Sequence, residues 1–124
     1  DPNDHRVRDR LAYALTLLGQ LRRRPEDWRG ALLPLDEAIE HTEALVGTSG
    51  FYMAWHNLAW ARMERAEVFL GLGSGDVCAE YRRAAEAYRR LAADRKAYAA
   101  NLADLQPKLA ACARDGRVPQ SAPR

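Results

Sequence analysis

Cysteine is scarce in this sequence, with only Cys78 and Cys112 in a chain of 124 residues. Two cysteines are too few for the disulfide framework of a small secreted domain, and no Cys-x-x-Cys or Cys/His cluster is present to hold zinc. Helical periodicity places both on inward or neighbouring stripes, where inert burial is the expected state. A reducing, cytoplasmic compartment therefore fits the cysteine usage best.

Long apolar runs are also missing, since no stretch approaches the roughly 18 residues that a membrane span requires. The segment Asp1-Pro2-Asn3-Asp4 lacks the basic and apolar regions of a signal peptide. Neither sign of charge dominates, because 19 basic and 17 acidic residues leave a formal net charge of +2. The sequence thus predicts a soluble domain with no membrane contact and with no strong field to attract nucleic acid.

Strand-like alternation of polar and apolar residues is absent, and apolar residues recur instead with helical spacing along the chain. The predicted fold class is all-α, with one domain over residues 4–114 and a flexible tail over residues 115–124. Proline and glycine divide the pattern into five helices, expected at about 4–24, 25–46, 51–72, 77–93 and 95–114. The third of these is apolar nearly all round, which is typical of a helix packed between neighbours.

Two prolines have different expected effects on the second helix. Pro25 suits the first turn of a new helix, and the acidic Glu26 and Asp27 favour a helix N-terminus. Pro34 lies inside the same helix and lacks the N–H that would bond the carbonyl of Gly30. We therefore expect a kink or a frayed first turn at Pro34.

The helix pairs repeat with a pattern of small and large residues. In the first copy the pattern positions are Leu15, Leu18, Gly19, Asp27, Trp28, Ala31, Leu35, Ala38 and Ile39, and the second copy opens Ala54-Trp55-His56-Asn57-Leu58-Ala59. On these residues the chain resembles the tetratricopeptide repeat (TPR) family. The resemblance implies a right-handed stack of antiparallel helix pairs, a TPR-like α-α superhelix. Repeat 1 would span about 12–45 and an elongated repeat 2 about 52–93, with a capping helix or third opening at about 95–114.

Three departures from the family pattern leave the curvature of such a stack open. The proline that usually closes a repeat is absent at Glu43. Arg22 and Arg62 occupy the usual aromatic position of the first helix, and Pro34 interrupts the second helix. An unrelated helical bundle is the alternative fold.

In this family the first helices of successive repeats line a groove. The resemblance implies that the groove-facing residues here are Tyr13, Thr16, Gln20, Arg23, Met53, His56, Asn57, Trp60, Met63, Glu64, Asn101 and Asp104. This mixture of aromatic, thioether and polar groups suits recognition of a peptide or a partner helix. Ordinary core packing is the alternative interpretation of Met53, Trp60 and Met63, since their helix is apolar on every side.

Some relatives grip a peptide C-terminus with a two-carboxylate clamp of asparagines and lysines. Asn57 and Asn101 match the asparagine positions of that clamp. Ala97 stands where a cation is required, although Arg95 and Lys96 lie next to it, so we do not expect a complete clamp.

Residues that could carry catalysis or hold a metal form no recognisable set. His5, His41 and His56 fall on different helices, and Glu37 precedes His41 by four residues instead of the three of a di-iron signature. The glycines in residues 71–75 follow a helix, whereas a phosphate-binding loop follows a strand. The sequence therefore predicts no enzyme, no metal site and no cofactor.

The sequence favours a non-catalytic protein–protein interaction domain that binds a peptide segment or a partner domain in the helical groove. Arginine supplies all but two of the 19 cations, which fits GC-rich coding, and by analogy we expect a part of a larger bacterial regulatory or signalling protein. The partner is a protein or peptide, which includes the rest of the parent chain and a second copy. Two alternatives stay open: a self-associating structural module, and a small-ligand or signal-peptide sensor with a pocket near Tyr13, His56 and Trp60.

Overall fold

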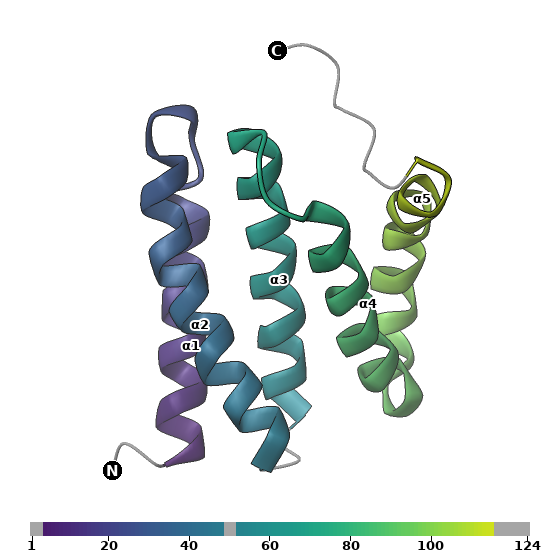
Figure 1. The fold of residues 1–124 in the computed structure, drawn as a ribbon. Helices are drawn as coiled ribbons and strands as arrows, with labels where there is room; N and C mark the ends of the chain where they lie inside the picture. The colour runs from purple at the N-terminus through teal and green to yellow at the C-terminus, as the bar shows by residue number, and fades with distance from the viewer. Residues whose placement is uncertain (1–3, 49–51, 116–124) are drawn as a thin grey trace.

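The computed structural model describes residues 4–48 and 52–115, and every regular element in these ranges is helical (Figure 1). The elements, in chain order, are α1 (His5–Leu21), η1 (Pro25–Asp27), α2 (Trp28–Thr48), α3 (Tyr52–Leu72), α4 (Val77–Asp94), η2 (Lys96–Tyr98) and α5 (Ala99–Asp115), where η marks a short 3₁₀ turn. The predicted all-α class with five helices is confirmed. None of these helices is both long and apolar enough to cross a bilayer. Residues 116–124 of the predicted tail lie outside the described ranges.

The ends of α1 follow from local chemistry. The Asp4 carboxylate accepts a hydrogen bond of 2.9 Å from the backbone N–H of Arg6, which satisfies a donor that the first helical turn leaves unpaired. The helix ends at Leu21, short of the predicted Arg24. Because a residue before proline avoids the α conformation, Arg24 is extended (φ −151°, ψ 157°) ahead of Pro25.

Pro34 lies inside α2, which runs unbroken from Trp28 to Thr48, so the predicted frayed first turn is absent. The carbonyl of Gly30 loses its helical donor because proline has no N–H. Arg22 Nη1, at the end of α1, donates to this carbonyl at 3.4 Å. The Arg22 side chain thus supplies the donor that the Gly30 carbonyl lacks within α2. The ring of Pro34 is buried.

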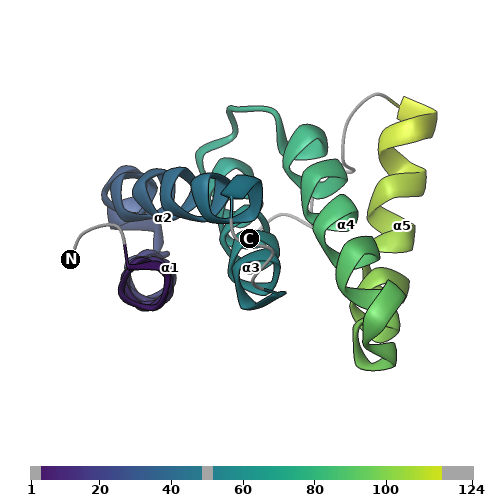
Figure 2. The same cartoon turned by 90° about the horizontal axis from the view of Figure 1, so that it is seen from below.

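The helices form a row of antiparallel pairs (Figure 1, Figure 2). α1 packs against α2, α3 packs against α4, and α5 lies alongside α4 at the far end. Both α1 and α2 contact α3, so the second pair stacks directly on the first. Small residues permit this approach: Ala31 and Ala38 are fully buried, and a Cβ added to Gly19 would lie 2.5 Å from Leu35 Cγ.

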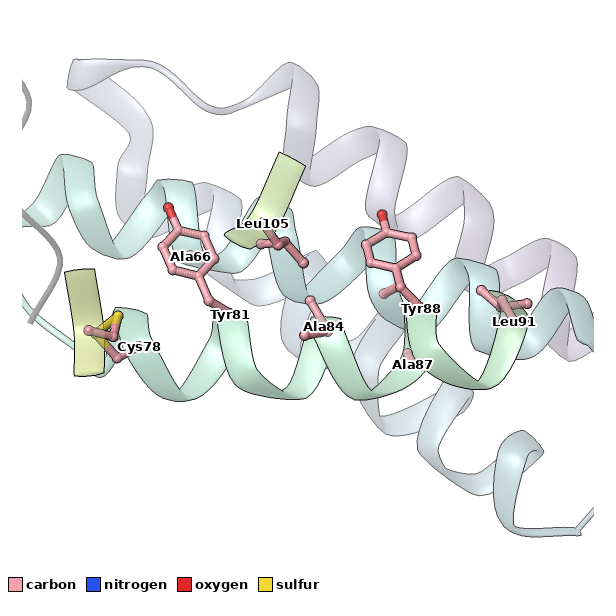
Figure 3. Close-up of a cluster of buried hydrophobic side chains, with 11 residues drawn as sticks. Ala66, Cys78, Tyr81, Ala84, Ala87, Tyr88, Leu91 and Leu105 are labelled. Atoms are coloured by element: carbon pink, nitrogen blue, oxygen red, sulfur yellow. A yellow bond between two sulfur atoms is a disulfide. The ribbon is translucent and has the colours of Figure 1, made fainter. Parts of the chain in front are cut away.

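The largest buried cluster lies between α3, α4 and α5 (Figure 3). Its buried members are Ala59, Ala66, Cys78, Tyr81, Ala84, Ala85, Ala87, Tyr88, Leu91, Leu105 and Cys112. The alanines let the helix backbones approach closely, and the two tyrosine rings fill the space that remains. This cluster fixes α4 and α5 to α3 and completes the row.

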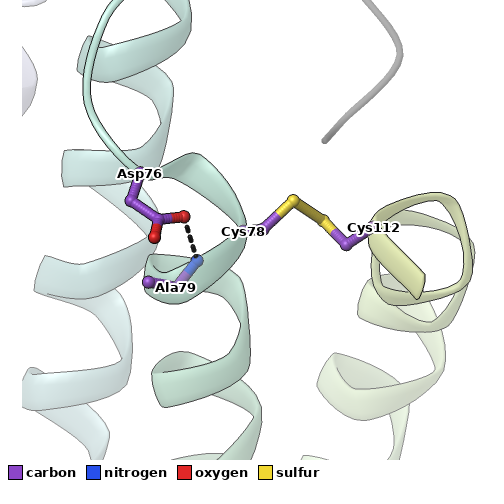
Figure 4. The surroundings of a disulfide bond; sticks show 4 residues. All are labelled: Asp76, Cys78, Ala79 and Cys112. Atoms are coloured by element: carbon purple, nitrogen blue, oxygen red, sulfur yellow. Dashed lines mark hydrogen bonds between the residues drawn. A yellow bond between two sulfur atoms is a disulfide. The ribbon is translucent and has the colours of Figure 1, made fainter. Parts of the chain in front are cut away.

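Cys78, near the start of α4, and Cys112, near the end of α5, form a disulfide with Cα atoms 5.8 Å apart (Figure 4). The prediction of two inert thiols is therefore wrong, since neither cysteine is free. The physical reason is that α4 and α5 pack side by side in opposite directions, which brings the first turn of one beside the last turn of the other. The Asp76 carboxylate fixes the turn that carries Cys78 by accepting a 2.9 Å bond from the N–H of Ala79.

Candidate functional site

The contact between α1 and α3 carries a pair of aromatic rings at its surface. The ring centroids of Tyr13 on α1 and Trp60 on α3 lie 5.3 Å apart, with their planes tilted by 50°. Tyr13 is 51% exposed and Trp60 is half-buried. Tilted aromatic pairs attract each other beyond the effect of burial, so this pair holds the two helices together and still presents aromatic surface to the outside.

A buried carboxylate lies one turn further along α3. Glu64 Oε2 accepts a 3.4 Å bond from Gln20 Nε2, and Arg23 Nη1 lies 3.2 Å from Glu64 Oε1. Burial raises the pKa of Glu64, and the Arg23 guanidinium offsets part of that effect. Arg23 is close enough for an ion pair but is not aligned for a hydrogen bond. Within the described residues, Oε1 therefore lacks a hydrogen-bond donor.

At the other end of this surface, α3 meets η2. His56 Nδ1 and the Tyr98 hydroxyl are 2.9 Å apart, and their rings meet edge to face at 5.7 Å. The Tyr98 ring stacks on the Tyr88 ring, with their centroids 6.3 Å apart. We call the whole surface the aromatic–polar strip and define it by Tyr13, Gln20, Arg23, His56, Trp60, Glu64 and Tyr98.

The protonation of His56 is predicted to depend on its burial. Burial lowers the pKa of His56 from its ordinary value of 6.5, and the Asp9 carboxylate offsets part of this effect. The unfolded chain therefore binds a proton on His56 at a higher pH than the folded chain does. The free energy of unfolding should fall as the pH drops below 6.5 and level off below the folded-state pKa.

An NMR titration of the His56 ring protons measures this directly and should give a pKa below 6.5. The variant His56→Gln should lose that part of the pH dependence of stability. A pKa at or above 6.5 in the folded protein would contradict the burial that the structure assigns to this ring.

Three of the predicted groove residues, Thr16, Asn57 and Glu64, are buried and so do not line an open groove. Thr16 is fully buried, and its hydroxyl donates to the carbonyl of Ala12 at 2.9 Å. Asn57 is 1% exposed, and its Nδ2 donates to Asp9 Oδ1 at 2.8 Å. Both lie on the packed faces of their helices, where a polar side chain must find its partner inside the protein. The bond from Asn57 to Asp9 instead joins α3 to α1.

The other residues of the predicted groove are accessible to different degrees. The exposed ones are Tyr13, Asn101 and Asp104, and the half-buried ones are Gln20, Arg23, Met53, His56, Trp60 and Met63. Met63 also packs against the cluster between α3, α4 and α5, as the core-packing interpretation expects. Asn101 lies on α5 and is not part of the strip.

A buried ion-pair network, which sequence reasoning missed, links α2, α3 and α4. Arg62 Nη1 donates to both carboxylate oxygens of Glu80 at 3.2 and 3.1 Å, and Arg62 Nη2 donates to Glu43 at 2.8 Å. Arg65 donates to Glu80 at 2.7 Å and to Asp36 at 2.9 Å. The signal in the sequence is an arginine at position 62 in a helix that is otherwise apolar nearly all round.

A pocket of about 440 Å³ opens beside this network. Its lining comes from three helices and comprises Glu43, Trp55, Leu58, Arg62, Arg83 and Glu86. Because Arg62 lies two positions from Trp60, it faces the opposite side of α3 from the strip. None of the residues Tyr13, His56 and Trp60, where the sensor alternative places a pocket, lines this one.

No protein-family model, curated protein or solved structure matches the chain. Among residues 4–48 and 52–115, no group of three or more His, Cys, Asp or Glu side chains is arranged to hold a metal ion. The case for a function therefore rests on the geometry of the strip.

Proposed function

We propose that this chain is a non-catalytic interaction domain that binds an extended peptide or partner segment along the aromatic–polar strip. The observation that carries the proposal is the Tyr13–Trp60 pair, which presents aromatic surface where two helix pairs meet. Large aromatic side chains next to polar groups are the composition of binding hot spots.

The buried carboxylate of Glu64 supports the same proposal. Its Oε1 atom is ion-paired with Arg23 Nη1 at 3.2 Å, so the buried carboxylate holds the Arg23 side chain at the strip. Arg23 and Gln20 border the same carboxylate and provide donors for peptide carbonyls.

We further propose that the helix pairs form a right-handed, TPR-like stack, with α1 and α3 as the first helices of two repeats and α5 as a cap. The contacts of α1 and α2 with α3 and the buried alanines at the pair interface support this arrangement. In such a stack, successive first helices present one continuous face to other molecules. The strip runs along that face.

A role within a larger bacterial regulatory or signalling protein is proposed by analogy and from the arginine-rich composition. A cytoplasmic location stays a prediction, and the disulfide between Cys78 and Cys112 counts against it. Disulfides persist in oxidising compartments and are rare in the cytosol, where thiols are kept reduced.

The proposal is tested by selecting peptides from a displayed random library on the immobilised domain and measuring their affinities for variants. Trp60→Ala and Tyr13→Ala should each weaken the selected peptides by roughly tenfold or more, since interface aromatics often contribute above 1 kcal/mol. Leu33→Ala is the control, because Leu33 is a large exposed apolar residue that lies on α2, away from the strip.

Two results would count against the proposal. One is equal affinity of the selected peptides for native protein and for folded Trp60→Ala. The other is a monomer–dimer equilibrium in sedimentation that the strip variants abolish, which would favour the self-association alternative instead.

A further inference from the structure

The outward face of α1 is a second surface, and it is apolar. Val7, Leu11, Leu18 and Leu21 are 53%, 45%, 38% and 62% exposed, and Ala14 between them is also exposed. Exposed aliphatic side chains are ordinary when scattered, but five on one line of a single helix form a contiguous patch. We call these five residues the α1 seam.

The spacing of the α1 seam is that of a helix-to-helix contact. Its members follow one another at intervals of four, three, four and three residues, which is the heptad repeat of two helices packed along their length. Tyr13 and Gln20 of the strip lie away from this line, so the two surfaces are distinct.

Among the described residues, no segment covers the α1 seam. α1 stands at the end of the row, where its described contacts are with α2 and α3 (Figure 2). The opposite end of the row differs, because the described exposed residues of α5 are polar residues, alanines and Pro107, with no large apolar side chain among them. Repeat arrays end in a polar face where they are capped. The row is therefore capped at α5 and open at α1.

On α1 itself, the exposed charges that flank the seam are positive. In the heptad register with Leu11 and Leu18 at the first core position, Arg10 and Arg22 occupy flanking positions and both are exposed. The acidic residue within α1 is Asp9, which is buried against Asn57. A helix that packs on the seam thus meets arginines along its edges.

The charges beside the seam distinguish two helices that could pack on it, the seam of a second copy and a helix of a partner protein. In a seam-to-seam dimer no carboxylate would face Arg10 or Arg22, because the flanking positions of α1 hold Arg8, Arg10, Leu15, Leu17 and Arg22. A helix with acidic flanks would instead pair with Arg10 and Arg22 while its apolar side covers Leu11 and Leu18. We propose that the α1 seam binds an acidic amphipathic helix of a partner protein.

The test uses two designed peptides of about three heptads with the same leucine core. One carries glutamates at the flanking positions, and the other carries lysines. The glutamate peptide should bind native protein at least roughly tenfold more tightly than the lysine peptide, with an affinity that falls as salt is added. The charge-reversed variant Arg10→Glu, which leaves Arg22 on the Gly30 carbonyl, should weaken binding of the glutamate peptide and strengthen binding of the lysine peptide, and a gain of lysine-peptide binding excludes misfolding.

A second pair of variants tests the apolar part. Leu11→Ser/Leu18→Ser should lose the glutamate peptide, whereas Leu33→Ser should keep it, because Leu33 is 76% exposed on α2 and outside the seam. The proposal is overturned by equal or absent binding of both peptides or by a dimer that Leu11→Ser/Leu18→Ser dissolves. Binding of anionic vesicles to the seam without binding of the glutamate peptide would also overturn the proposal, since the seam would then be a membrane-binding surface.

Discussion

Replacing Glu80 with alanine lowers the free energy of unfolding by about 3 to 5 kcal/mol, because removing one partner of a buried ion pair leaves an uncompensated charge. Glu80 accepts hydrogen bonds from both Arg62 and Arg65, and the side chains of Arg62 and Glu80 are almost completely buried. Glu43, the other partner of Arg62, is exposed to solvent, so its charge alone does not compensate the buried charge of Arg62. Chemical denaturation of the variant measures the loss.

The control is Glu86→Ala, an exposed glutamate on the same helix, which should change stability by less than about 0.5 kcal/mol. Replacing Arg62 and Glu80 together by leucine should recover most of the loss, because apolar residues tolerate the same burial. A loss below about 1 kcal/mol for Glu80→Ala would show that the pair is hydrated in solution.

Removing the disulfide with Cys78→Ser/Cys112→Ser lowers the free energy of unfolding by about 3 to 4 kcal/mol in the chain-entropy account. The bond joins residues 34 apart in sequence and so restricts a long segment of the unfolded chain. In the fold it fixes α5, which packs on α4 and η2 at the end of the row. Hydrogen exchange should therefore show α5 losing protection before α3 does.

Reductant provides the matched comparison for the disulfide. It should lower the melting temperature of native protein to near that of the double serine variant and should leave the variant unchanged. If reductant does not change the melting temperature of native protein, Cys78 and Cys112 are not joined in solution and are free thiols, as the sequence predicts.

Those features of the fold that depend on local chemistry could be predicted from the sequence. Apolar spacing and glycine and proline positions located five helices, and the small residues Gly19, Ala31 and Ala38 indicated where helices meet. Each of these signals acts within one or two turns of the chain. The end of α1 was placed too late because Arg24, before Pro25, cannot stay helical.

The features that were missed depend on which helices lie side by side. Cys78 and Cys112 come together only through the antiparallel contact of α4 and α5. Thr16 and Asn57 were placed in a groove because the repeat pattern gives a position on a helix but not the depth of packing around it. Arg62 stood out in an apolar helix, yet its partners come from two other helices and could not be identified from spacing.

Binding of a peptide along the strip on α1, α3 and η2 is tested most directly by adding a library-selected peptide to the ¹⁵N-labelled domain and mapping the amide shifts. The strip predicts shifts that cluster around Tyr13, Gln20, His56 and Trp60 and that disappear in Trp60→Ala. Shifts confined to the pocket beside Arg62 and Arg83, or to the α1 seam, would contradict it.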